Sequence, residues 1–185
     1  GKGSRYVGTD ENHEILGSNT SRIVRYSETP VISVGNPFHA KRIRSIMLPL
    51  DLSKETRQKV NYGIYMAKLF GASIRVVSAL WDKKNEYVVR TLNSQMDQVV
   101  KFILKEGIEV TGEIIESDKD HKSLVPILMN YERQHEEIDL IIVMTQQENA
   151  ITHFFMGSHA TEYIRRSEPP VMTVVPRQLE LYYIS

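Results

Sequence analysis

The sequence predicts an α/β protein built on an open, five-stranded parallel sheet that is flanked by helices. Short apolar runs alternate along the chain with longer segments whose apolar residues recur at helical spacing. One of these runs, residues 140–144, is apolar at every position, which is typical of a central parallel strand. Strands and helices that alternate in this way, with right-handed crossovers, form a parallel sheet between helices.

A segment near the start of the chain is repeated near its end. Residues 17–34 align without gaps on residues 157–174 at an offset of 140, and eight of the 18 pairs are identical. Gly17/Gly157 and Pro30/Pro170 are among the identical pairs. A period of this length is the size of a domain rather than of a solenoid repeat. We therefore expect the end of one domain, followed by a complete second copy.

The first strand of the complete copy is expected at residues 45–50, a short apolar run. The helix after it is expected to begin at Lys54 and to stop at Gly71. Its apolar positions lie near 3.6-residue spacing: Val60, Ile64, Ala67 and Leu69. Residues 74–80 are predicted to form the second strand.

A long helix follows and is expected to end before Gly107. Its apolar face is Val88, Leu92, Met96, Val99 and Ile103. Residues 108–115 alternate, as in a strand with one more exposed face. A third helix, from Lys122 to about residue 134, carries its apolar positions at Leu124, Ile127, Leu128 and Tyr131. Met66, Met96 and Met129 are interpreted as core residues.

The last helix of the copy is expected to open at Gly157 and Ser158 and to end near Ser167. The final strand, residues 171–175, follows two prolines. We divide the chain into four parts: residues 1–35, the end of a first domain; 36–42, a linker; 43–176, the second domain; and 177–185, an apolar C-terminal tail.

Composition excludes several classes of protein. Lys+Arg and Asp+Glu balance at 23 each, which argues against nucleic acid or an anionic membrane as a partner. The absence of cysteine excludes disulfides, thiolate metal sites and a cysteine nucleophile, and fits the reducing cytoplasm, where we expect the protein. The six histidines show no paired metal-ligand spacing on a helix, apart from a loose match at His153 and His159, so no metal is expected.

Two loops are candidates for ligand binding, because ligands of open parallel sheets bind beyond the carboxyl ends of the strands. The first loop carries Pro49 and Asp51, and the second precedes the helix opened by Gly157 and Ser158. Such a helix start offers free N–H groups to a phosphate. An Asp before a helix also serves as an N-cap, and a Gly-Ser pair is also a local helix start, so both interpretations stand at this point.

Taken together, these residues resemble the universal stress protein family, of the tandem-domain type. The resemblance is carried by residues 49–53 after the first strand, by the strand 139–144, and by Gly157-Ser158 with Pro170-Val171. It implies a Rossmann-like sheet of the adenine nucleotide α-hydrolase type. Many members bind ATP and others do not. The resemblance places Asp51 near the adenine or ribose, and Gly157 and Ser158 at the end of a glycine-rich phosphate loop.

The middle of that phosphate loop departs from the family pattern. The two earlier glycines fall on Met144 and Gln147, and Glu148 adds an anion where the ligand is anionic. Side chains at these positions replace the bare backbone that approaches phosphate oxygens. The sequence therefore predicts that ATP binding by this copy is weak or absent.

We expect a non-catalytic stress-response protein that acts through domain pairing or dimerisation. Its last strand is an apolar sheet edge, so residues 31–34 are expected to lie antiparallel to residues 171–175. The alternative is an ATP-binding stress sensor with weak ATP hydrolysis. An enzyme would need intact phosphate glycines and a positioned base, for which Glu148 is the only nearby candidate. A nucleic-acid-binding module is disfavoured by the charge balance.

Overall fold

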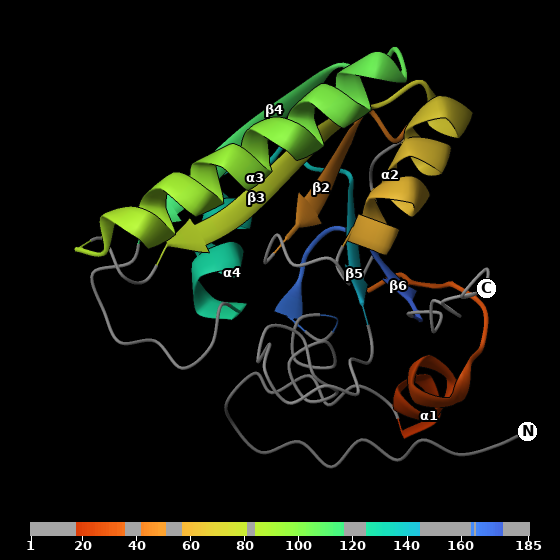
Figure 1. Ribbon diagram of the computed structural model, residues 1–185. Helices are drawn as coiled ribbons and strands as arrows, with labels where there is room; N and C mark the ends of the chain where they lie inside the picture. The colour runs from red at the N-terminus through yellow and green to blue at the C-terminus, as the bar shows by residue number, and fades with distance from the viewer. Residues whose placement is uncertain are drawn as a thin grey trace, which may run out of the picture.

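The protein forms one six-stranded sheet flanked by helices (Figure 1). The computed structural model describes residues 18–35, 42–50, 57–80, 84–116, 125–144, 164 and 166–175. The strands are β1 (Val31–Ser33), β2 (Ser45–Pro49), β3 (Ser73–Leu80), β4 (Val110–Glu116), β5 (Leu140–Met144) and β6 (Val171–Val174). The helices are α1 (Ser18–Tyr26), α2 (Arg57–Phe70), α3 (Glu86–Lys105) and α4 (Val125–Gln134).

The strand order is β1-β6-β5-β2-β3-β4. The five strands from β2 to β6 are parallel, as the sequence predicts, and β1 adds an antiparallel sixth strand at the edge beside β6. The long helix α3 and α2 lie together on one face, while α4 lies on the other (Figure 1). The central strands β2 and β5 are buried at every position.

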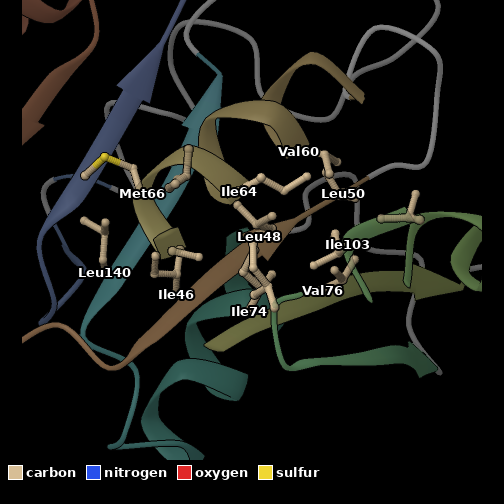
Figure 2. Packing of buried hydrophobic residues seen from close by; sticks show 14 of the residues in the cluster. Ile46, Leu48, Leu50, Val60, Ile64, Met66, Ile74, Val76, Ile103 and Leu140 are labelled. Carbon is tan, nitrogen blue, oxygen red and sulfur yellow. The ribbon is translucent and has the colours of Figure 1, made fainter. Parts of the chain in front are cut away.

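Two apolar clusters, one on each face of the sheet, hold these layers together. Beneath α2 and α3, alternate residues of β2 and β3 such as Leu48 and Val76 pack against Val60 and Ile103 (Figure 2). On the opposite face, Leu128 packs in a cluster that also contains Val24 and Ile164, which correspond in the repeat. Helix α1 therefore contributes to the same core as α4.

Among the described residues, most expected helix faces are confirmed, with two corrections; Leu124, expected on the third helix, lies outside these residues. Met66, Met96 and Met129 are buried, and Gly71 and Gly107 end their helices with positive φ angles of 64° and 75°. Leu69, however, is 61% exposed. It lies two residues beyond the buried Ala67, which rotates it about 200° around the helix from that position. Val88 is also exposed, because the first turns of α3 precede the buried positions Met96, Val99 and Ile103.

The pairing of β1 with β6 has local two-fold symmetry. Val31 lies opposite Thr173, Ile32 opposite Met172, and Ser33 opposite Val171. At the offset of 140, Thr173 corresponds to Ser33 and Val171 to Val31, so each repeated segment presents the same three positions to the other. The antiparallel pairing expected from the sequence is thus confirmed. The division of the chain into two domains stays a prediction.

The turns before the two strands repeat the same hydrogen bond. Ser27 Oγ donates to Thr29 O at 2.8 Å, and the corresponding Ser167 Oγ donates to Pro169 O at 3.2 Å. The second turn is also bound by a carboxylate of α4. Glu132 Oε1, in a side chain that is 6% exposed, accepts from Ser167 Oγ at 3.1 Å and from Glu168 N–H at 2.8 Å.

Candidate ligand crevice

The strand order places the topological switch point between β2 and β5. The chain passes from β2 to β3 and β4 on one side, and then to β5 and β6 on the other. In open α/β sheets, ligands bind outside the carboxyl ends of the strands at such a point. Pro49 ends β2 and Met144 ends β5. The two loops singled out from the sequence thus follow the two strands that flank the switch point.

The carbonyl of Pro49 points from β2 toward β5. Leu50 N–H donates to Val77 O of β3 at 2.8 Å, and a trans peptide directs its N–H and its C=O to opposite sides. The Pro49 oxygen, in the same peptide unit, must therefore face β5. The recorded pairing of β2 with β5 covers only Ile46 with Leu140 and Met47 with Ile141. The oxygen thus lies at the carboxyl end of β2, beyond the two residue pairs that join β2 to β5.

Lys59 supplies a partner of this oxygen, although no motif in the sequence singled this residue out. Its side chain is fully buried, at 0% exposure, and its ammonium Nζ donates to Pro49 O. Side chains of a helix lean toward its N-terminus, which in α2 is the end nearer to the end of β2. Lys59 can therefore reach the switch point from the helix above.

A pattern in α2 shows in retrospect why this lysine is buried. Lys59, Gly63 and Ala67 follow one another at four-residue spacing, so they share one face of the helix. Gly63 and Ala67 are buried, and a Cβ on Gly63 would lie 2.6 Å from Leu48 Cδ1. Gly63 and Ala67 allow this face of α2 to approach the sheet closely. Lys59, one turn earlier on the same face, is therefore also directed into the interior.

The other predicted site residues stay predictions. Pro49 ends β2 beside the switch point, and its backbone oxygen accepts from Lys59 Nζ. Asp51, Gly157 and Ser158 lie outside the described residues. Met144, one of the two positions where the expected glycine is missing, is 2% exposed and packs in the cluster beneath α2.

A second polar cluster lies on the α4 face. Arg75 Nη1 is 3.2 Å from Glu113 Oε1 and 3.2 Å from the Tyr131 hydroxyl, and Nη2 is 2.7 Å from Glu137 Oε1. Tyr131 donates to Glu113 at 2.7 Å, and its ring centroid lies 4.1 Å from that of His135 with the two planes tilted by 37°. Arg75 comes near the start of β3, so this cluster lies toward the amino ends of the strands, away from the crevice. It joins β3, β4 and α4 and has the character of a structural network.

Tyr131 makes this network sensitive to alkaline pH. Burial, followed by the hydrogen bond to Glu113, raises the pKa of Tyr131 to about 12. Because the folded pKa exceeds the value of about 10 in an unfolded chain, the contribution to stability is complete below pH 10 and is lost as pH rises toward 12. We expect the free energy of unfolding to fall by roughly 1–2 kcal/mol over this range.

Tyr131→Phe is expected to remove that alkaline decrease, since phenylalanine does not titrate. Urea unfolding at several pH values between 8 and about 11.5 measures the slope in both proteins. Parallel pH dependence of the two proteins would contradict the assignment.

The comparisons with known proteins identify the family. The model of the universal stress protein family matches residues 42–175. The chain belongs to the universal stress protein family. A search of curated protein sequences finds no match to it.

Solved structures of universal stress proteins share this fold. One from Archaeoglobus fulgidus DSM 4304 superposes with a TM-score of 0.66 at 16% identity, over 88% of this chain and 55% of its own. This chain therefore spans only about half of that protein's length. A universal stress protein in complex with cAMP gives a TM-score of 0.56 at 15% identity, over 74% of this chain and 100% of its own. A universal stress protein from Archaeoglobus fulgidus in complex with dAMP gives a TM-score of 0.55 at 18% identity, over 72% of this chain and 98% of its own.

At these identities the likeness concerns the fold. Among the helices that the structure describes, none has both the length and the apolar character needed to cross a membrane. No cluster of three or more histidine, aspartate or glutamate side chains suited to a metal occurs among the described residues.

Proposed function

We propose that this member of the universal stress protein family is non-catalytic and acts in the cytoplasmic stress response through the pairing of two domain copies. The observation that carries the proposal is the symmetric register of β1 with β6, in which Ile32 lies opposite its counterpart Met172. A register in which equivalent positions face each other is the geometry of an isologous interface. It supports a tandem arrangement, or a homodimer made through the same strand.

The degenerate phosphate loop is the second part of the proposal. Met144 fills a position where the family pattern has glycine, and its side chain is buried among apolar residues at the end of β5. Backbone that approaches a phosphate closely favours glycine. We infer that adenine nucleotides bind this chain weakly or not at all, and that neither nucleic acid nor a membrane is its partner.

An ATP-binding stress sensor with weak ATP hydrolysis is the second candidate. It is favoured by the two solved relatives in complex with cAMP and dAMP. In this case Asp51, Gly157 and Ser158 would hold the nucleotide.

Native mass spectrometry of the purified chain, without and then with AMP, cAMP or Mg-ATP, separates the two candidates. A chain that remains bare with each added nucleotide supports the pairing function. Copurified nucleotide, or saturable binding at micromolar concentration, would overturn the degenerate-loop proposal. ATP turnover that Asp51→Ala abolishes would establish the sensor with hydrolysis.

A further inference from the structure

We propose that Lys59 closes the switch-point crevice from within, because its ammonium takes the Pro49 carbonyl that a bound ligand would otherwise meet. We call this contact the Lys59 cap. The inference rests on the proposed weak nucleotide binding and assigns a cause to it. It makes Lys59 the residue that determines whether a nucleobase ligand can enter this copy.

The cap occupies the hydrogen-bonding group that the sheet offers to a ligand. The Pro49 oxygen faces β5 beyond the two pairs where β2 and β5 are joined. An acceptor in that position suits a ligand with an N–H donor, and the donor on an adenine base is its amino group. The Lys59 ammonium already donates to this oxygen. The adenine amino group and the Lys59 ammonium would compete for the Pro49 oxygen.

The surroundings keep the ammonium there. Leu50 and Val60, the chain neighbours of Pro49 and Lys59, are each at most 2% exposed and belong to one apolar cluster. Leu50 and Val60 lie close together where α2 covers the end of β2 (Figure 2). A buried charge must stay hydrogen-bonded, so displacing the ammonium from the Pro49 oxygen costs free energy. A ligand that needs the Pro49 oxygen can bind only those molecules in which Lys59 has left it. Its apparent affinity is reduced in proportion to that small fraction of molecules.

Removal of the cap should restore binding. Lys59→Ala shortens the side chain and frees the Pro49 oxygen. The matched control is Lys68→Ala, on the same helix, where the lysine is about half exposed and pairs with Glu106 at 2.6 Å. Both variants lose one positive charge, so the long-range attraction for an anionic nucleotide changes equally. Affinity for AMP and cAMP is measured by isothermal titration calorimetry.

We expect Lys59→Ala to bind AMP at least tenfold more tightly than the original chain, and Lys68→Ala to bind no better than the original. An unchanged affinity in Lys59→Ala would overturn the cap while leaving the degenerate-loop proposal intact. A loss of affinity in Lys59→Ala alone would make Lys59 a ligand contact, which also overturns the cap. Tight binding by the original chain would instead refute the proposed function.

A measurement on the unmodified chain covers the case in which Lys59→Ala does not fold. Reductive methylation with formaldehyde, followed by peptide mass spectrometry, compares the labelling rates of Lys59 and Lys68. A capped Lys59 should react at least tenfold more slowly than Lys68. Comparable rates would show that the crevice opens freely and would refute the cap.

Discussion

A chain that starts at Arg42 is expected to dimerise. Removal of residues 1–41 takes away β1 and leaves β6 as an open edge, all four of whose residues, Val171–Val174, are buried in the intact chain. An apolar strand with unpaired N–H and C=O groups recruits another strand. Because β1 pairs with β6 in a register that maps each copy onto the other, β6 of a second molecule can take the same place, with Met172 opposite Met172.

Sedimentation equilibrium gives the mass of the shortened chain in solution. The mass should correspond to two chains, with the intact protein and a chain shortened by residues 176–185 as controls that keep β1 on this edge. A shortened chain that is folded and monomeric at all concentrations would show that the β6 edge does not drive pairing. The pairing function would then lose its main support.

Glu132→Ala is expected to lower the free energy of unfolding by about 2–3 kcal/mol. The buried carboxylate of Glu132 accepts the Ser167 hydroxyl at 3.1 Å and the Glu168 N–H at 2.8 Å. These hydrogen bonds connect α4 to the turn that precedes β6. A hydrogen bond to a charged group contributes more than a neutral one, and the donors that lose their acceptor remain partly buried. The turn should loosen in consequence, and with it the start of β6.

Urea unfolding measures this loss, with Glu136→Ala as the control. Glu136 is exposed on the turn after α4, and its replacement should change stability by no more than about 0.5 kcal/mol. Equal effects of the two substitutions would contradict a structural role for Glu132. Glu132→Gln, which keeps an acceptor oxygen but not the charge, is expected to lie between them.

The order of elements could be predicted from the sequence because each depends on a local pattern. The apolar run 140–144 became the fully buried β5, and Gly71 and Gly107 end their helices with the positive φ that glycine adopts at least cost. The repeat carried more information than any single motif. It predicted that two strands about 140 residues apart would pair, and the pair has the register that the repeat implies.

The candidate site could be predicted only in part. The topology confirms that the strands before the two chosen loops flank the switch point, but Asp51, Gly157 and Ser158 themselves lie outside the described residues. Lys59 was missed because a lysine in a helix is most often exposed. Whether a charged side chain can be buried depends on whether the facing element provides a hydrogen-bond partner. Here the end of β2 presents the carbonyl of Pro49 to the lysine.

The sequence by itself determined the α/β class, the positions of the strands and the pairing of the repeated ends, since periodicity and repetition are properties of the chain. Only the tertiary structure showed that Lys59 meets Pro49, that Arg75 joins Glu113 and Glu137, and that Glu132 holds the turn before β6. Each of these contacts joins two different elements of the fold. The faces that such elements turn toward each other are set by packing, which no local pattern of residues specifies.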